Sequence, residues 1–470
     1  MNTNLAPILA RSTGAADFSN DTIWVSVIKA VAILLFLLLS VLFALWFERR
    51  VIARFQQRLG PNVRGPFGLV QSIPDALKLI LKEDITVKAA DKVIYLIAPV
   101  ISVFCAFMIY AVIPFGPEVT IPFTDFVTPL QLTDLPVSIL YILGITGLGV
   151  YGIVLGGWSS GSTYPLLGAV RSTAQIISYE LGMSLALVSV LLVAGSMSTS
   201  EIVNSQENLW WAFALLPAFV VYLISAFGEV NRLPFDLPEA EGELVAGYQT
   251  EYSSMKFAWF YLAEYINMLN VAAVATTVFM GGWRAPWPLV TLFGEGVDQG
   301  WWGFLWFILK IWLFMFLFVW VRATLLRFRY DQFMAFGWKV LIPVALVWLG
   351  LVAAFQGVRH FTSFDPTAID VGGLSLRTVL FGIAGILIIV TVVMYLIPDR
   401  EAKPAPDGKA AKGTSGADAT TDEPFDAFAG GFPVPPLPGQ KLPPSKRRAR
   451  VTTPAAPAED ATEDEEKTNG

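Results

Sequence analysis

Nine long apolar runs dominate this sequence and favour a bundle of membrane-spanning helices over any soluble fold. They cover approximately residues 23–46, 91–113, 137–157, 173–195, 209–228, 257–280, 303–323, 338–356 and 376–397. Crossing the hydrocarbon core takes roughly 20 helical residues, and lipid cannot hydrogen-bond an open backbone. The sequence therefore predicts an all-α polytopic membrane protein with about nine transmembrane helices. Beyond the last run, residues 401–470 are rich in Pro, Ala and charged residues, which is typical of a disordered cytoplasmic tail.

The composition agrees with this class and bears on cofactor sites. Only 15% of the 470 residues are charged, whereas soluble domains average about 25%. Cys105 is the single cysteine and His360 the single histidine. One cysteine cannot hold an iron–sulfur cluster, and one histidine in a connector cannot supply the paired ligands of a membrane haem. We therefore expect no metal site in this chain.

Lysine and arginine are spread unevenly over the connectors, and this distribution predicts the orientation of the chain. The first connector is rich in basic residues, namely Arg49, Arg50, Arg54, Arg58, Arg64, Lys78, Lys82 and Lys88. The second connector, about 114–136, and the fourth, about 196–208, contain none. The odd connectors are therefore predicted to be cytoplasmic, with the N-terminal segment 1–22 outside. That segment lacks the basic start and apolar centre of a signal peptide, so the first helix is expected to be retained.

A charged but periodic stretch in the first connector predicts a helix that lies at the membrane surface. Within residues 67–84, Leu69, Ile73 and Leu77 recur at helical spacing, and charged residues occupy the other faces. The stretch is too polar to span the bilayer. We expect it at the cytoplasmic interface, and packing beneath a partner protein is the alternative.

Two carboxylates lie inside predicted helices, where charge is costly. Glu180 belongs to the fourth predicted helix and Glu264 to the sixth. A charge near the bilayer centre costs about 2.5–3.5 kcal/mol or more, so such residues suggest a function. The structural alternative is a carboxyl group that is hydrogen-bonded between helices. Lys310 and Cys105, also inside predicted helices, are interpreted as packing or partner contacts.

The fifth connector, residues 229–256, is unusually acidic for a predicted cytoplasmic segment. Its six carboxylates face only two basic residues, Arg232 and Lys256; the acids are Glu229, Asp236, Glu239, Glu241, Glu243 and Glu251. The sequence "DLPE", residues 236–239, fits the start of a helix, with Asp236 as cap and Glu239 three residues later. If the acids are buried, they could relay protons, with Arg232 as their counter-ion. A solvated acidic loop is the competing interpretation.

Charged residues also gather at the predicted cytoplasmic ends of the first and seventh helices. "FERR" supplies Glu48, Arg49 and Arg50, and "RATLLRFRYDQ" supplies Arg322 and Arg329. Many of these arginines fit simple anchoring by the positive-inside rule. The alternative is a polar mouth that admits an amphiphile with a polar head.

Four long motifs resemble the H subunit of the proton-pumping NADH–quinone oxidoreductase, respiratory complex I. They are "ERR…QRLGPNVRGPFGLVQSIPDALKLILKED", "RSTAQIISYELG", "EVNRLPFDLPEAEGELVAGYQTEYSSMKFAWFYLAEY" and "RATLLRFRYDQFMAFGWKVLIP". The resemblance covers about residues 20–356, in order. It implies an eight-helix membrane core over residues 23–356, to which the helix 376–397 and the tail are additions.

The resemblance implies that the chain supplies most of a quinone tunnel and the first part of a proton path in a bacterial plasma membrane. Positions that match the tunnel are Glu48, Arg49, Arg232, Asp236, Glu251, Tyr261, Glu264 and Arg329. Positions that match the carboxylate path are Glu180, Glu229, Glu239, Glu241 and Glu243. The quinone is ubiquinone or menaquinone, and FMN and the iron–sulfur clusters belong to partner subunits. The implied partners are the peripheral quinone-module subunits, the neighbouring membrane-arm subunits and lipid, not nucleic acid.

Three other functions compete with this one. A membrane subunit of an ion-pumping hydrogenase shares the ancestry but passes no electrons to quinone. A free-standing transporter is expected to contain inverted repeats and broken helices, and the sequence has neither signal. A purely structural anchor for the peripheral arm is the third alternative.

Overall fold

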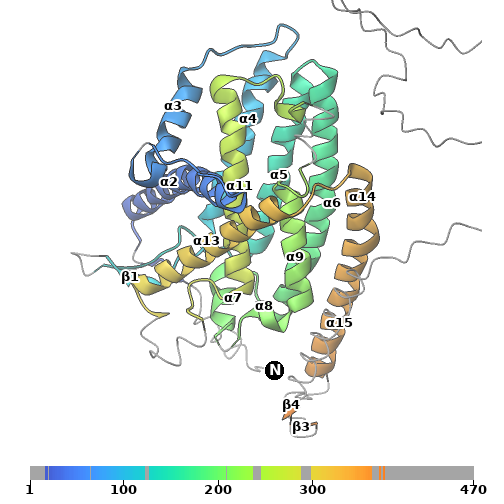
Figure 1. Cartoon of the computed structure of the whole chain (residues 1–470). Helices are drawn as coiled ribbons and strands as arrows, with labels where there is room; N and C mark the ends of the chain where they lie inside the picture. Colours follow the sequence, from blue (N-terminus) through green and yellow to red (C-terminus); the bar gives the residue numbers. More distant parts are fainter. Residues whose placement is uncertain are drawn as a thin grey trace, which may run out of the picture. The chain divides into compact units, whose positions relative to one another are not determined.

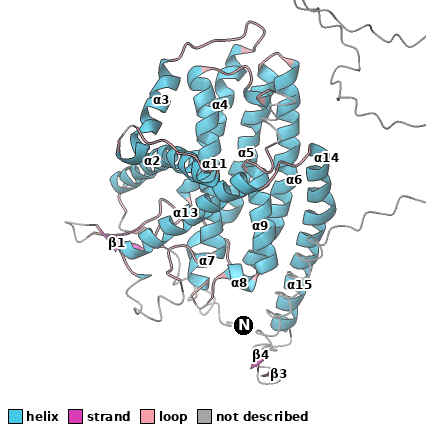
Figure 2. Ribbon diagram, viewed as in Figure 1, coloured by secondary structure: helices cyan, strands magenta, loops and turns pink. Residues whose placement is uncertain are grey.

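The computed structural model describes residues 16–19, 21–63, 65–121, 126–207, 209–236, 245–286, 298–361, 370–371 and 374–375. Over these residues the chain forms a bundle of helices with two short hairpins (Figures 1 and 2). The predicted ninth helix, 376–397, and the tail, 401–470, lie outside the described residues. So do Glu239, Glu241 and Glu243, together with the helix predicted to start at "DLPE".

Seven helices in the described part of the chain are long and apolar enough to cross a membrane. They are α2 (Ile23–Phe55), α4 (Lys92–Met108) with its extension η2 (Ile109–Ala111), α5 (Ser138–Ser159), α6 (Thr163–Ala194), α11 (Ser254–Phe279), α13 (Trp301–Thr324), and the continuous rod of α14 (Tyr330–Phe336), η5 (Gly337–Leu341) and α15 (Ile342–Phe361). The predicted class, an all-α polytopic membrane protein, is confirmed.

The fifth predicted span, 209–228, is divided in the structure. It forms a single turn, α8 (Trp211–Ala214), and a 14-residue helix, α9 (Leu216–Glu229). Leu215 between them has non-helical dihedrals. Pro217 lies at the start of α9, where its missing N–H favours a helix start over a continuous helix. Apolar composition alone did not predict this break.

Two of the boundary differences from the sequence prediction concern the interfacial helix and α6. The interfacial helix, predicted over 67–84, consists of η1 (Pro66–Gln71) and α3 (Ser72–Leu81). Its α-helical part begins only at Ser72, because Phe67 and Gly68 adopt positive φ values of 55° and 78°. A Cβ at Gly68 would lie 2.4 Å from the carbonyl oxygen of Pro61, so this turn requires glycine. In the other case, α6 begins at Thr163, ten residues before the predicted 173.

The remaining elements are short. They are β1 (Glu118–Thr120) paired antiparallel with β2 (Val127–Pro129), α7 (Thr199–Ser205), η3 (Gly247–Gln249), and the hairpin of β3 (Asp370–Val371) and β4 (Leu374–Ser375).

Hydrogen bonds between connectors confirm that the odd connectors share one end of the bundle. The first connector is joined to the third, because the Asp91 N–H donates to the Ser159 carbonyl oxygen at 3.0 Å. It is joined to the fifth, because the Ile85 N–H donates to Ser253 Oγ at 2.8 Å. At the opposite end, Thr199 Oγ1 of the fourth connector donates to the Val112 carbonyl at 2.7 Å, beside the second. In the view of Figure 1 the first group lies at the top, and α7 and α8 lie at the bottom.

Helix α11 lies at the centre of the bundle, and 83% of its most apolar 18-residue window is buried. Helix α4 packs beside it and α6 and α9 also contact it, whereas α2 and α13 cross the upright helices obliquely (Figure 1). Helices α4 and α5 approach closely at Gly152, where a Cβ would lie 2.1 Å from Ser102 Oγ. This central position of α11 places its polar side chains inside protein rather than in lipid.

Candidate functional site

A group of buried charged and phenolic side chains lies where α2, α11, α13 and the fifth connector meet. We call it the Glu48 cluster; its members are Glu48, Arg232, Tyr261, Glu264, Tyr265 and Arg322. Glu48 is 5% exposed and Arg232 8%. Charges at such depth are stable only when they are paired and hydrogen-bonded.

Glu48 is the centre of this cluster. Its Oε1 forms an ion pair with Nη1 of Arg322 and lies 3.7 Å from Nη1 of Arg232. Its Oε2 accepts a 2.6 Å hydrogen bond from the Tyr265 hydroxyl. The carboxylate is thus bound from three helices or connectors, which gives it one defined orientation.

Arg232 links Glu48 to the second acid of the cluster. Its Nε lies 2.8 Å from Oε1 of Glu264, an ion pair by distance although the N–H is not aligned for a hydrogen bond. The guanidinium also lies over the Tyr265 ring, 4.4 Å from its centroid. Burial alone would lower the pKa of Arg232, but the charge of Glu264 and the nearby tyrosines outweigh it and raise the pKa. Arg232 therefore stays charged at any physiological pH.

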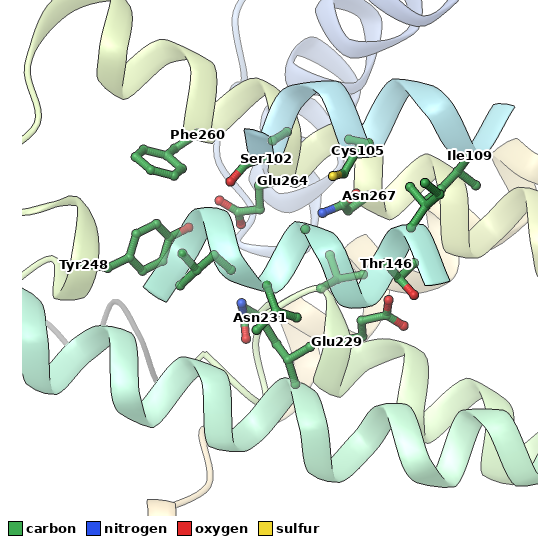
Figure 3. A pocket seen from close by; sticks show the side chains of 18 residues that line it. Ser102, Cys105, Ile109, Thr146, Glu229, Asn231, Tyr248, Phe260, Glu264 and Asn267 are labelled. Carbon is green, nitrogen blue, oxygen red and sulfur yellow. The ribbon is translucent and has the colours of Figure 1, made fainter. Parts of the chain in front are cut away.

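A narrow cavity runs from this cluster between α4, α5, α9 and α11 (Figure 3). Its space for water-molecule centres is about 60 Å³, enough for a short chain of waters at roughly 10–15 Å³ each. Its polar lining consists of Ser102, Cys105, Thr146, Glu229, Asn231, Tyr248, Glu264 and Asn267. In Figure 3, Tyr248 and Phe260 lie at one end and Thr146 at the other. The cavity therefore connects Glu264 of the Glu48 cluster with the middle of α5 and the C-terminal end of α9.

Two lining atoms have no hydrogen-bond partner among the described residues. They are Oε2 of Glu229 and Oδ1 of Asn231, and both are buried. A buried oxygen without a partner is costly unless water or a ligand satisfies it. The cavity is therefore of the kind that holds ordered water.

Glu180 lies beyond the Thr146 end of the cavity. The Thr146 hydroxyl donates to its Oε1 at 3.3 Å. Because α6 begins at Thr163 and not at 173, Glu180 is 17 residues into this 32-residue helix, or about 26 Å along its axis. It is thus near the middle of the helix, deeper than the sequence predicts.

Gln175 fastens the start of the fifth connector to α6. Its Nε2 donates to the carbonyl oxygens of Gly228 at 2.7 Å and Phe235 at 2.8 Å. The ring of Phe235 packs against Phe333 of α14, with centroids 4.4 Å apart. These contacts hold the turn that carries Glu229 and Arg232.

Comparisons with known proteins identify the family of this chain. A family model described as NADH dehydrogenase matches residues 28–353. The H subunit of the NADH-quinone oxidoreductase of Streptomyces avermitilis is 51% identical over 448 residues, which are 94% of this chain and 93% of that protein. The chain belongs to the family of NADH-quinone oxidoreductase H subunits. Like other members of this family, it is a membrane protein and one subunit of an oxidoreductase complex.

Four of the positions to which the family resemblance pointed come together in the Glu48 cluster: Glu48, Arg232, Tyr261 and Glu264. Tyr261 joins through a 3.1 Å contact between its hydroxyl and that of Tyr265. Arg232, predicted as counter-ion of the connector acids, has Glu264 and Glu48 as its described ion partners. The charge that balances Arg232 thus comes from helices α11 and α2.

Other predicted tunnel positions lie outside this cluster. Arg49 pairs with Asp75 of α3 at the surface, and Arg329 lies 3.4 Å from exposed Asp331. Glu251 contributes its backbone carbonyl, which accepts a 2.6 Å hydrogen bond from Tyr95. Asp236 is half-buried directly after Phe235. Arg49 and Arg329 thus pair at the surface, apart from the buried ion pairs of the Glu48 cluster.

The sequence did not indicate Tyr265, Thr146 or Gln175 as site residues, and it indicated Arg322 only as an anchor or as part of a polar mouth. Tyr265 lies four residues after Tyr261 and therefore on the same helix face, and this spacing could have indicated it. Lys310, interpreted as a packing contact, donates to three carbonyl oxygens of the turn after α11: Met280 at 2.6 Å, Gly282 at 2.9 Å and Arg284 at 2.6 Å. Cys105 lines the cavity.

Proposed function

We propose that this chain forms the access tunnel for the quinone of a bacterial NADH–quinone oxidoreductase and couples quinone reduction to proton translocation. The observation that carries the proposal is the buried route from the Glu48 cluster through the cavity to Glu229 and Glu180. The printed name of the Streptomyces relative supports quinone as the substrate. Ubiquinone and menaquinone both fit these observations.

In the proposed mechanism, quinone reduction takes up two protons near the inner end of the tunnel. The change in charge acts on Glu48 and Glu264, which compete for Arg232. When one acid gains a proton, Arg232 moves toward the other, because a neutral carboxyl binds a guanidinium less strongly than a carboxylate does. Glu264 lines the cavity, so its change reaches Glu229 and Glu180. The connector acids Glu239, Glu241 and Glu243 remain proposed members of the same path.

The chain itself carries out no electron transfer in this proposal. FMN and the iron–sulfur clusters belong to peripheral subunits, and the proton path continues into neighbouring membrane-arm subunits. The excess of basic residues in the first connector supports a cytoplasmic location for the odd connectors and the C-terminus, with the N-terminus outside. The membrane is then the bacterial plasma membrane.

The test is to replace Glu180 or Glu229 by Gln in the assembled enzyme. Proton pumping is measured in closed vesicles with NADH as electron donor, and NADH–quinone reductase activity is measured with an uncoupler present. We expect pumping per electron to fall about tenfold or more, as when a positioned acid–base group is removed. The matched control is Glu118→Gln, an exposed carboxylate in β1 at the other end of the bundle. Wild-type pumping in both Glu180→Gln and Glu229→Gln would refute the carboxylate path.

The main alternative is a structural anchor for the peripheral arm. Asp236→Asn tests it, because Asp236 directly follows the anchored Phe235. Normal quinone reduction and pumping in this variant, together with normal values for Glu180→Gln, would favour the anchor. The hydrogenase alternative has less support, since the 51% identity is to a protein of a quinone oxidoreductase.

A further inference from the structure

Thr146 of α5 lies between the cavity and Glu180. It lines the cavity, whereas Glu180 does not. Its hydroxyl makes the hydrogen bond that the described part of the chain offers to the Glu180 carboxylate. The same carboxylate oxygen lies against the backbone of α5, since a Cβ built at Gly147 would be 3.6 Å from it. A proton that leaves the cavity for Glu180 therefore meets Thr146 first.

The Thr146 hydroxyl has one hydrogen and two acceptors. The Leu143 carbonyl oxygen lies 2.9 Å away and Glu180 Oε1 3.3 Å away. A hydroxyl can donate to only one of them fully at a time, but it can also accept. An ionised Glu180 attracts the hydrogen. A protonated Glu180 instead donates its own hydrogen to Thr146 Oγ1, and the threonine then donates to Leu143.

We infer that Thr146 is a relay that passes protons between the cavity and Glu180. The Glu229 carboxyl, acting through cavity water that accepts one proton and passes on another, gives a proton to Thr146 Oγ1. The original hydroxyl hydrogen leaves at the same time for Glu180 Oε1. One O–H bond forms and one breaks at Oγ1, so Thr146 stays neutral, Glu180 becomes protonated and the donor loses one proton. The Leu143 carbonyl holds the hydroxyl in place between transfers.

A purely structural role is the competing explanation. Threonine in an apolar helix often donates to a carbonyl three or four residues earlier, as Thr146 does to Leu143. Such a role depends on the shape and volume of the side chain. A relay depends on the presence of a hydroxyl or of a water molecule in its place.

Three variants of Thr146 separate the two roles. Thr146→Ser keeps the hydroxyl, Thr146→Val keeps the volume without it, and Thr146→Ala leaves room that cavity water can fill. For a relay, proton pumping per electron in the assembled complex is expected to decrease in the order Ser, Ala, Val. The Val variant should fall about tenfold or more below wild type. For packing alone, Val should pump at least as well as Ala, and that order, or three wild-type values, would overturn the inference.

Difference infrared spectroscopy supplies a readout that packing does not move. The carboxyl C=O band of protonated Glu180 is assigned by its loss in Glu180→Gln. A relay requires this band to shift in Thr146→Val, which offers neither a hydroxyl nor room for water, and to keep its position in Thr146→Ser. If the Val variant does not assemble, pumping in Thr146→Ser and Thr146→Ala decides, and wild-type pumping in both refutes the relay.

This inference rests on the proposed function, but the two fail differently. Glu180→Gln with normal pumping refutes the carboxylate path itself. Impaired Glu180→Gln with normal Thr146→Val and Thr146→Ala refutes only the relay. Solvent deuterium adds an independent check. If protons pass through the Thr146 hydroxyl, its loss slows the proton transfer, so the solvent isotope effect on pumping should be larger in Thr146→Val than in Thr146→Ser.

Discussion

Neutralising Glu48 should loosen the contact between α2 and α13, because the site is buried and its partners are charged. The Glu48 side chain is 7% exposed, Arg232 9% and Arg322 27%. Removing one partner from a buried ion pair costs about 3–5 kcal/mol. Gln retains one oxygen that can accept from Tyr265, so we take the lower end, about 3 kcal/mol. At 1.4 kcal/mol for each factor of ten, local opening becomes roughly 150-fold more frequent in Glu48→Gln.

The matched control is Asp75→Asn, which removes a carboxylate from an ion pair at the surface. Asp75 pairs with Arg49, and their side chains are 31% and 50% exposed. Exposed pairs contribute about 0–1 kcal/mol, so opening should change by less than about fivefold. The two variants thus remove the same charge from adjacent parts of the chain at different depths.

Hydrogen–deuterium exchange with mass spectrometry on the purified complex measures both effects. Peptides from the C-terminal ends of α2 and α13 should exchange roughly 150-fold faster in Glu48→Gln and nearly at the wild-type rate in Asp75→Asn. NADH oxidation by a water-soluble acceptor should be normal in both, since it does not involve this chain in the proposed mechanism. Equal exchange in the two variants would show that burial of Glu48 does not set the strength of the cluster.

Two further predictions concern packing around the site. Gly152→Ala should lower the amount of assembled complex, because the new methyl group would lie 2.1 Å from Ser102 Oγ. The control Gly144→Ala should be neutral, because its new methyl group has nothing within 4 Å. Heat-inactivation half-lives compare the two variants, and equal half-lives would contradict the packing argument. Gln175→Met leaves two buried carbonyls without their donors, at roughly 1–3 kcal/mol each, so residues 228–236 should lose exchange protection; unchanged protection there would show that other contacts hold this turn.

The apolar runs of the sequence were sufficient to predict the class of fold and most helices. Each run has to be a helix, because lipid offers its backbone no hydrogen bonds. The bonds from Asp91 to Ser159 and from Ile85 to Ser253 place the first, third and fifth connectors at one end of the bundle, and the cytoplasmic side of that end stays a prediction from the basic residues. The division of 209–228 and the early start of α6 were not predicted, because apolarity does not mark where a helix breaks or where a polar first turn belongs to it.

Long motifs indicated Glu48, Arg232 and Glu264 individually, through resemblance, but not their mutual contacts. Thr146 carried no signal, since threonine in an apolar helix often just bonds its own backbone, and Gln175 belonged to a matching motif without a role of its own. Their roles exist only because α5 packs on α6 and the end of α9 reaches Gln175. Within lipid a buried charge must find partners on other helices. The sequence therefore determined that such charges are present, and tertiary packing decided which residues, from Glu48 to Arg322, balance one another.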